Sequence, residues 1–257
     1  MISKMKKILI VGGANGIGLS VAMLLADYEE VETVYIVDKA CLADKYKKNK
    51  VKSYQFDLTS KEYSFFDQFH DIDALFISAG FGRLSLFKDV PDHMIETYFQ
   101  VNTISVICLI NRFYNKLESK APFYCGVMVS ISAYLSSPFF SVYSATKAAL
   151  RFFIESINVE LEKYGTENRV LNISPGSIQG TSFNQGETDL LQTRELASNI
   201  IRRLNNREDL FIPEYDEIFR SVIKRYNEDF RAEGRRSYDF KVNSGRVKAS
   251  PINPTRD

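Results

Sequence analysis

A tyrosine and a lysine four residues apart, Tyr143 and Lys147, are the side chains of this sequence best suited to moving a proton. If the segment is helical, a four-residue step places both groups on one face, where the ammonium favours the phenolate. A free tyrosine titrates near ~10, so acid–base work at neutral pH needs such a neighbour. Ser130, thirteen residues upstream, would add a hydroxyl from the end of a preceding strand. Four-residue spacings also arise by chance, so the strands and helices that position these residues have to show whether the pair forms a site.

Short apolar runs alternate with helical patterns along the chain. The expected strands are Ile8–Val11, Thr33–Val37, Val51–Phe56, Ala74–Ser78, Val127–Ile131, Val170–Ile173 and Leu210–Ile212. The expected helices are Gly16–Tyr28, Lys61–Phe69, Asp92–Leu117, Tyr143–Lys163 and Leu190–Leu204. Because most strands are continuous apolar runs, helices should cover both of their faces. The alternation predicts an α/β fold, a single doubly wound Rossmann-type parallel sheet with helices on both faces.

No internal repeat or linker divides the chain. Residues 1–230 are expected to form one domain that includes an amphipathic helix over about 214–230. Residues 231–257 are polar, carry mixed charge and are expected to be a mobile tail.

Composition and charge exclude several classes of function. A net charge of +1 gives no electrostatic case for binding nucleic acid. Three widely spaced cysteines suggest neither a disulfide framework nor a zinc site. The two histidines, His70 and His93, do not suggest a catalytic triad or a metal site. The first apolar run reaches glycines after four residues, too soon for a signal peptide or a membrane span, so we expect a cytoplasmic protein.

A glycine-rich turn between the first strand and the first helix predicts a dinucleotide site. The segment reads Gly12-Gly13-Ala14-Asn15-Gly16-Ile17-Gly18. Gly12 permits the tight turn, Gly16 lets the backbone approach a pyrophosphate, and Gly18 allows close contact between helix and strand. The N-terminus of the helix, with Asn15 and Ile17, offers free N–H groups and a positive dipole to phosphate.

An acidic residue after the second strand indicates which dinucleotide is bound. Asp38 lies twenty residues after Gly18, where a carboxylate accepts hydrogen bonds from the ribose hydroxyls and repels a 2′-phosphate. NAD is therefore favoured over NADP, although the adjacent Lys39 could offset part of the repulsion. Asp57-Leu58, after the third strand, could cover the adenine. The alternative for both aspartates is a solvated turn residue.

With these residues assembled, the chain resembles the classical short-chain dehydrogenase/reductase family from about Lys6 to Ile212. The glycine turn matches the family's pattern, with Val11 in place of a threonine. The other segments that match are Ser78-Ala79-Gly80 (the family has asparagine where this chain has Ser78), Asn102, Ser130 with Tyr143 and Lys147, and Pro175-Gly176-Ser177-Ile178. The last of these touches the nicotinamide in the family.

The catalytic serine is open between two residues. Aligning on Gly126 favours a serine nearer Ser132, whereas aligning on Ser137-Pro138 through Tyr143 needs no gap and favours Ser130. Ser130 and Ser132 are two apart on the expected strand, so both could face the site. We prefer Ser130.

The resemblance implies reversible hydride transfer between nicotinamide and a carbonyl or secondary alcohol. It implies that Tyr143 exchanges the proton with the substrate oxygen and that Ser130 hydrogen-bonds that oxygen. Lys147 would lower the pKa of Tyr143 and hold the nicotinamide ribose. Asn102 would hold a water that relays protons from Lys147; its alternative is a buried amide satisfied locally.

Two other functions stay open: a nucleotide-binding regulatory protein without turnover, and a sugar-nucleotide epimerase or dehydratase, for which this chain ends too soon. The partner expected is a small alcohol or ketone, and a homodimer is possible. Aromatic side chains near the site make a largely apolar substrate plausible, with ordinary packing as the alternative: Tyr134, Phe139, Phe140 and Phe183. The polar stretch Thr181–Thr188 could be a lid. The helix over 214–230 could shield the pocket, contact another subunit or rest on a membrane surface.

Overall fold

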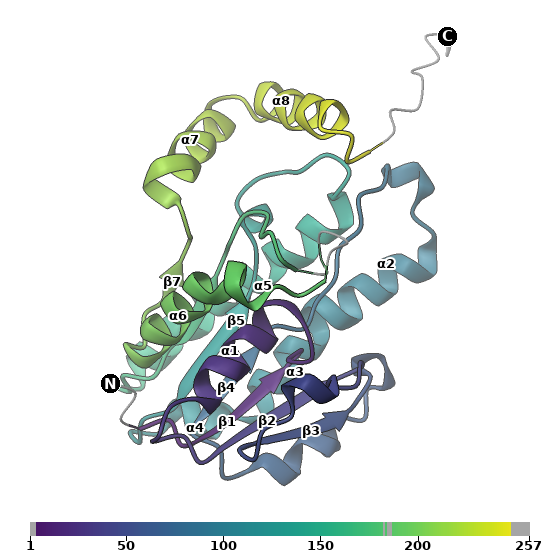
Figure 1. Ribbon diagram of the computed structural model, residues 1–257. Helices are drawn as coiled ribbons and strands as arrows, with labels where there is room; N and C mark the ends of the chain where they lie inside the picture. The colour runs from purple at the N-terminus through teal and green to yellow at the C-terminus, as the bar shows by residue number, and fades with distance from the viewer. Residues whose placement is uncertain (1–3, 182, 184–186, 248–257) are drawn as a thin grey trace, which may run out of the picture.

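The computed structural model describes residues 4–181, 183 and 187–247. Seven strands form one sheet in the order β3-β2-β1-β4-β5-β6-β7, and all six pairings are parallel (Figure 1). The strands are β1 Lys7–Val11, β2 Thr33–Asp38, β3 Val51–Gln55, β4 Ala74–Ile77, β5 Tyr124–Met128, β6 Val170–Ile173 and β7 Leu210–Phe211. The doubly wound parallel sheet is confirmed. Its order reverses between β1 and β4, and ligands bind beyond the carboxyl ends of strands at such a point.

Helices cover both faces of the sheet, which explains the continuous apolar strands. One face carries α1 (Gly16–Ala26) and α6 (Leu190–Asn205), and the other carries α3 (Ser105–Arg112) and α5 (Ser141–Lys163). In β1, Ile8 and Ile10 pack into the core under α1 and α6, whereas Leu9 and Val11 pack into the opposite core. Every position of such a strand is buried, so no polar alternation is left in its sequence.

The segment expected to be one helix over Asp92–Leu117 is interrupted. It consists of α2 (Asp92–Phe99), a π-helical turn η5 (Gln100–Ile104), α3, and then α4 (Tyr114–Glu118) after a break at Phe113. A π turn inserts an extra residue and changes the direction in which nearby side chains point. Lys61–Phe69, also expected to be helical, forms a 3₁₀ helix, η3 (Tyr63–Phe69).

The fifth strand lies three residues earlier than expected. It starts at Tyr124 because this residue pairs with Ala74 of β4. Its regular part ends at Met128, although the Val129 N–H still donates to the Ile173 carbonyl at 2.7 Å. Ser130 then caps a short 3₁₀ helix, η6 (Ile131–Ala133), so Ser130 and Ser132 do not share a strand as expected.

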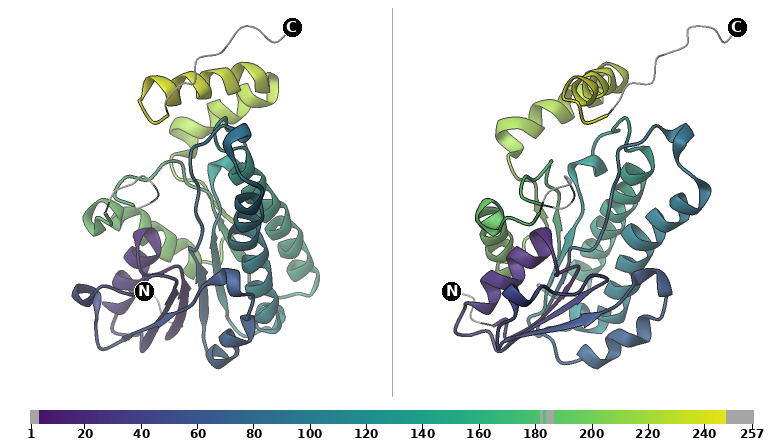
Figure 2. Two further views of the ribbon diagram at one scale, coloured as in Figure 1. Left: turned by 90° about the vertical axis from the view of Figure 1, so that its right-hand side faces the viewer. Right: turned by 45° about the vertical axis from the view of Figure 1, so that its right-hand side comes forward.

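The expectation of a tail from residue 231 is wrong for residues 231–243. After a π-helical turn η8 (Tyr215–Phe219), the chain forms α7 (Arg220–Glu228) and α8 (Phe230–Asn243). The Asp229 carboxylate caps α8 by accepting the Arg231 and Ala232 N–H groups, each at 2.9 Å. Helix α8 packs on α7, and the two stand beyond the layers of the domain (Figures 1 and 2). Residues 248–257 of the expected tail lie outside the described residues.

None of the helices in the described part of the chain has the length and apolar character needed to cross a bilayer.

Candidate active site

The structure brings Ser130, Tyr143 and Lys147 together at the carboxyl end of β5. Tyr143 and Lys147 lie on the first turns of α5, and Ser130 follows β5 in extended backbone. All three are buried; Tyr143 is 8% exposed and Lys147 3%. The Ser130 hydroxyl lies close enough to the Tyr143 phenol to favour the ionised form of that phenol. The structure therefore brings the three predicted residues to one buried place at the end of β5.

Burial, rather than mutual charge, dominates the ionisation of this pair. It raises the pKa of Tyr143 to about 12, and the hydrogen bond from Ser130 opposes that rise. It also lowers the pKa of Lys147 to about 7. The Lys147 Nζ atom lies 5.8 Å from the centre of the Tyr143 ring and donates to the Met128 carbonyl at 2.8 Å. The expected lowering of the tyrosine pKa by Lys147 is not seen in this structure, because desolvation sets the direction of both shifts.

Asn102 lies in the π turn and joins it to the loop after β4. Its amide oxygen accepts the Phe81 N–H and its amide nitrogen donates to the Phe81 carbonyl, both at 2.9 Å. A Cβ atom added to Gly80 would lie 3.2 Å from Asn102 Oδ1 and 3.3 Å from Lys147 Nζ. Asn102 and Lys147 therefore meet at Gly80. The hydrogen bonds of Asn102 correspond to the alternative that its amide is satisfied locally.

Of the two candidate serines, Ser130 is the one whose hydroxyl acts on the Tyr143 phenol. Its hydroxyl oxygen also accepts the Ser132 N–H at 3.1 Å, and Ser132 is half-buried within η6. This geometry supports Ser130, whose part in the reaction stays a prediction.

The glycine turn has the shape that a pyrophosphate site needs. Gly12 has φ +86°, and a Cβ on Gly18 would lie 2.1 Å from the Gly12 carbonyl oxygen, so neither position accepts a side chain without a shift. Asn15 caps α1 without a side-chain hydrogen bond to the helix, which leaves backbone N–H groups at its start for an anion. The Gly16 N–H donates to Thr188 Oγ1 at 2.7 Å. A hydroxyl oxygen thus accepts the kind of hydrogen bond that a phosphate oxygen would, and the residues fit a dinucleotide.

The carboxylates expected near the adenosine lie at the ends of β2 and β3. Asp38 accepts the Ala14 and Ala40 N–H groups, each at 2.9 Å, so its carboxylate is fixed beside the glycine turn. Lys39 Nζ lies 2.7 Å from Asp57, and this lysine together with Thr59 lowers the pKa of Asp57 to about 2. The cation beside Asp38 is therefore already paired.

The remaining predicted cofactor residues line the same edge of the sheet. The Ser78 and Ala79 N–H groups both donate to the Val11 carbonyl, so the backbone of Ser78 ties β4 to β1. The Pro175 carbonyl accepts the Ile131 N–H at 3.0 Å. Leu58 is buried and Ile178 packs against the core under α1.

Two aromatic rings lie next to the ring of Tyr143. The rings of Phe140 and Phe183 lie 5.3 and 5.5 Å from the Tyr143 ring, as expected for lining residues. Tyr134 instead receives a hydrogen bond from Asn172 and stacks under Arg151, and Phe139 faces α8. Of the expected lid, residues 182 and 184–186 lie outside the described residues.

Sequence reasoning missed three contacts. The backbone of Phe81 bonds the amide of Asn102, and the hydroxyl of Thr188 accepts the Gly16 N–H. The ring of Phe219 lies against Gly176. Each contact joins segments far apart in the chain, and no local pattern predicts it.

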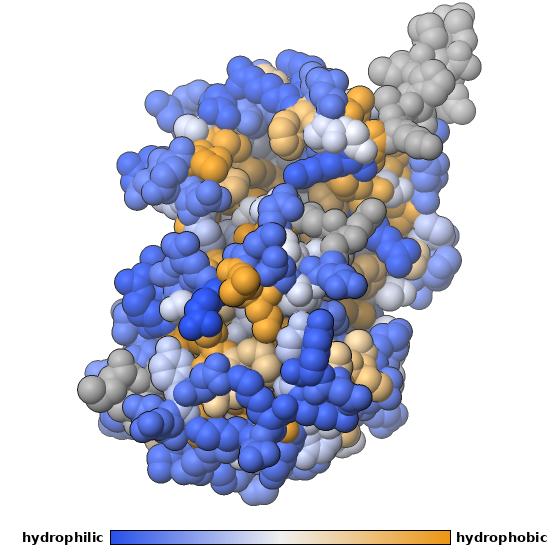
Figure 3. All heavy atoms as spheres, viewed as in Figure 1, coloured by the Kyte–Doolittle hydropathy of each residue, from blue (hydrophilic) through white to orange (hydrophobic). Residues whose placement is uncertain are grey.

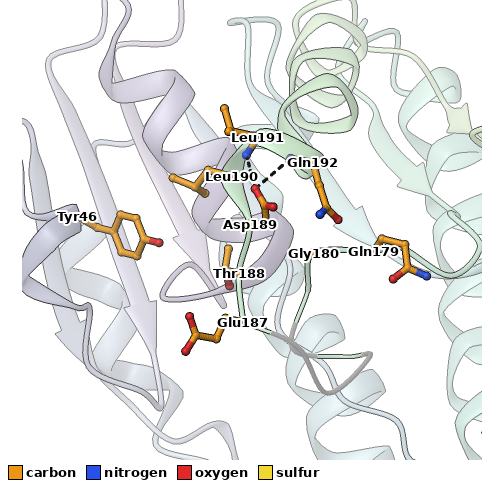
Figure 4. Close-up of a pocket in the computed structure, with 9 residues that line it drawn as sticks. All are labelled: Tyr46, Gln179, Gly180, Glu187, Thr188, Asp189, Leu190, Leu191 and Gln192. Atoms are coloured by element: carbon orange, nitrogen blue, oxygen red, sulfur yellow. Dashed lines mark hydrogen bonds between the residues drawn. The ribbon is translucent and has the colours of Figure 1, made fainter.

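A pocket opens beside the glycine turn, between η1 (Asp44–Tyr46) and the start of α6 (Figure 4). Its described lining includes Tyr46, Gly180 and Thr188, the residue that accepts the Gly16 N–H. Asp189 shapes its wall by capping α6 through the Leu191 and Gln192 N–H groups. The pocket is thus next to the proposed phosphate position and apart from Tyr143.

Comparison with known proteins agrees with this geometry. The sequence model described as "short chain dehydrogenase" matches residues 6–190. An L-rhamnose 1-dehydrogenase (NADP(+)) of Thermoplasma acidophilum is 28% identical over 232 residues, which are 82% of this chain and 87% of that protein. A cyclopentanol dehydrogenase of Comamonas is 29% identical over 67% of this chain and 73% of the relative.

Solved structures show the same fold. A short-chain dehydrogenase from Burkholderia cenocepacia in complex with NADP superposes with a TM-score of 0.73 at 20% identity, covering 92% of this chain and 99% of that one. An alcohol dehydrogenase from Thermococcus sibiricus, complexed with 5-hydroxy-NADP, superposes with a TM-score of 0.67 at 18% identity, over 81% of this chain and 96% of that one. This chain belongs to the short-chain dehydrogenase family and is an NAD(P)-dependent oxidoreductase that acts on alcohol or carbonyl groups.

Proposed function

We propose that this oxidoreductase uses Tyr143 as its general acid and base, with Ser130 as the hydrogen-bond donor to the substrate oxygen. The observation that carries the proposal is that Ser130, Tyr143 and Lys147 are all buried together at the end of β5, with the Ser130 hydroxyl close enough to the Tyr143 phenol to favour its ionised form. The phenol is protonated at neutral pH, so it holds the proton that a carbonyl takes up on reduction, and its raised pKa makes it a weaker acid than a free tyrosine. The cofactor, when bound, supplies or accepts the hydride.

Lys147 and Asn102 complete the site in this proposal. The Lys147 amine has a pKa near neutrality and lies close to Tyr143, so it can pass a proton toward the phenol and donate a hydrogen bond to the nicotinamide ribose. Asn102 fixes the Phe81 segment beside that amine and keeps the π turn in place. A water held there would complete the relay to solvent.

NAD is the proposed preferred cofactor. The support is the Asp38 carboxylate, which two backbone N–H groups fix at the end of β2, where a ribose is bound in this fold. Lys39, the cation that could attract a 2′-phosphate, is paired with Asp57. The names of the relatives mention NADP, which describes those proteins; the local charge at Asp38 argues for NAD in this one.

The proposed substrate is a small alcohol or ketone with an apolar body, because Phe140 and Phe183 flank the Tyr143 phenol. We place the enzyme in the cytoplasm, where its three free cysteines stay reduced. We also propose that two copies associate through α5, whose outer face exposes Phe152 and Val159 two turns apart.

Replacing Tyr143 by phenylalanine removes the proton donor and keeps the ring. Turnover of NADH across a panel of ketones should fall by about 10²- to 10⁴-fold. Binding of NADH, followed by fluorescence, should change little. Tyr164→Phe, at the exposed end of α5, is the matched control. Activity retained in Tyr143→Phe would remove this residue from the chemistry.

Lys147→Met should stabilise the protein near neutral pH while it removes activity. The folded pKa of Lys147 is about 7 against an ordinary 10.5, so the unfolded chain binds more protons between these values. The cost of burying the amine is therefore fully present below pH 7 and fades as the pH rises toward 10. The melting temperature of the variant should exceed that of the wild type by on the order of 3 °C at pH 6. The difference should shrink at pH 9.5, and a constant or growing difference would contradict the burial of a desolvated amine.

Asp38→Asn should narrow the discrimination between NADH and NADPH. The wild type should bind NADH more tightly, and loss of one negative charge should improve NADPH binding by about tenfold relative to NADH. Fluorescence titration with both cofactors measures this ratio. Asp71→Asn is a control, since Asp71 pairs with Lys7 at the opposite end of the sheet. Tighter binding of NADPH by the wild type would refute the role given to Asp38.

Phe152→Glu should weaken the association of two copies by about 100-fold, because it places a charge in an apolar interface. Sedimentation velocity of the wild type and the variant measures the shift toward monomer. Phe230 is an exposed phenylalanine on α8, away from α5 in the sequence. Phe230→Glu should therefore leave the distribution between monomer and dimer unchanged. A wild type that stays monomeric at high concentration would end this part of the proposal.

A further inference from the structure

Lys241, near the end of α8, is a buried lysine that the reaction as described does not use. It is 8% exposed. Its Nζ donates to Ser137 Oγ at 2.6 Å, to the Pro138 carbonyl at 2.8 Å and to Ser237 Oγ at 3.1 Å. An ammonium has three N–H groups, so every donor has an acceptor. Two of these acceptors lie more than 100 residues earlier, in the loop between η6 and α5.

The cation is expensive to hold at this position. Its three acceptors are all neutral, and burial, with a smaller contribution from the Arg246 charge, lowers the pKa of Lys241 to about 8. Burying a charge without an opposite charge costs free energy that only good hydrogen bonds offset. An apolar residue would attach a helix to the domain at a smaller cost, so the contact points to a need for directed hydrogen bonds.

A second contact joins α8 to the same loop. The ring of Tyr238 stacks on Phe139 with centroids 4.6 Å apart. Phe139 has φ +69°, in the left-handed region that a phenylalanine rarely adopts. Its carbonyl accepts the Ser85 N–H at 2.9 Å. Strain of this kind persists only where the surroundings hold the residue in place, and α8 supplies part of that hold.

The loop leads directly to the phenol of Tyr143. Phe140 caps α5, and its ring lies 5.3 Å from the Tyr143 ring. Lys241 Nζ lies 5.6 Å from the centre of the Phe140 ring, within range of a cation–π contact. One aromatic ring therefore separates the Lys241 ammonium from the proton donor.

The same C-terminal segment reaches the other side of the site. A Cβ on Gly176 would lie 2.7 Å from the ring of Phe219 in η8, so that ring rests on the Pro175-Gly176 turn. Apolar side chains recur at helical spacing from the end of η8 along α7 and are only half-buried: Phe219, Val222, Ile223 and Tyr226. Figure 3 shows apolar surface in the recess beneath the helical pair. The pair thus spans from the loop before Tyr143 to the segment expected at the nicotinamide.

We propose that Lys241 is a positioning residue for the reaction: its ammonium fastens α8 to residues 137–140 and so holds Phe140 and the wall of the acceptor site against Tyr143. The proposal rests on the function proposed for Tyr143. It makes α7 and α8 the roof of the acceptor site, and Lys241 the contact that keeps the roof closed over the apolar body of a ketone or alcohol. Ser130, Tyr143 and Lys147 keep the chemistry.

The effect of Lys241→Met should separate the acceptor from the cofactor. The KM for a bulky apolar ketone, such as an aryl or cyclic ketone, should rise about tenfold, and the KM for acetone should rise less, because acetone makes little contact with Phe140. The dissociation constant for NADH should stay within about twofold. Lys241→Arg keeps the charge and the donors and should recover part of the loss. Lys224→Met, on the exposed face of α7, is the matched control.

A double-mutant cycle with Ser137→Ala tests whether the two side chains act through one contact. If they do, the double variant should lose little more than Lys241→Met alone. Additive losses, a KM increase no larger than in Lys224→Met, or an equal loss of NADH affinity would each overturn the proposal.

Hydrogen exchange reads the same contact without turnover. In Lys241→Met, the amides of residues 139–144 and of α8 should exchange about tenfold faster than in the wild type, and those of β1 should be unchanged. Wild-type exchange rates at residues 139–144 would overturn the role of Lys241 whatever the activity. A wild type that binds NADH and turns over no ketone or alcohol would instead overturn the proposed function, and the exchange result would still decide the contact.

Discussion

The Lys147 amine lies away from water where three separate parts of the chain meet. The end of β5 gives it the Met128 carbonyl, the π turn brings Asn102 near it, and the loop after β4 passes beside it as Gly80. A desolvated amine needs a nearby acceptor, because removing one hydrogen-bond partner from a buried polar group costs about 1–3 kcal/mol. Close approach to that acceptor requires that the neighbouring backbone carry little bulk. The geometry of the site follows from meeting both demands at one point.

The π turn η5 lets Asn102 and Gly80 lie beside the Lys147 amine. A regular helix through Gln100–Ile104 would continue α2 into α3 without the inserted residue, and Asn102 would point elsewhere. With the turn, its amide oxygen and nitrogen both bond the Phe81 backbone and hold the segment that begins at Gly80. The glycine turn works on the same principle, since α1 can approach β1 only because Gly18 lacks a side chain beside the Gly12 carbonyl. In both places the missing Cβ atom is what allows the close approach.

The sequence predicts the parts of this protein that depend on neighbours in the chain. The buried strands, such as Ile8–Val11 and Val170–Ile173, are continuous apolar runs because both of their faces are covered, and the pairing of Tyr143 with Lys147 follows from helical spacing. The parts that depend on residues far apart in the chain cannot be predicted from the sequence in this way. Thr188 bonds Gly16 from 172 positions away, and the pKa values of Tyr143 and Lys147 depend on how completely the fold excludes water. A charge pair seen in a sequence carries no information on that desolvation.

In the C-terminal segment, composition predicts disorder where the structure has a helix. Its composition is polar, which is typical of disorder, yet Asp229 is a good helix cap and α8 forms behind it. An isolated helix of this length is marginal in water, so tertiary contacts have to hold it. Contacts of Tyr238 and Lys241 with the loop before Tyr143 contribute to that hold, beside the packing of α8 on α7. Part of the stability of α8 and the proposed acceptor wall therefore depend on the same contacts. On the proposal made for Lys241, a change in the last helix would shift the loop before Tyr143, although the sheet and α5 are complete without that helix.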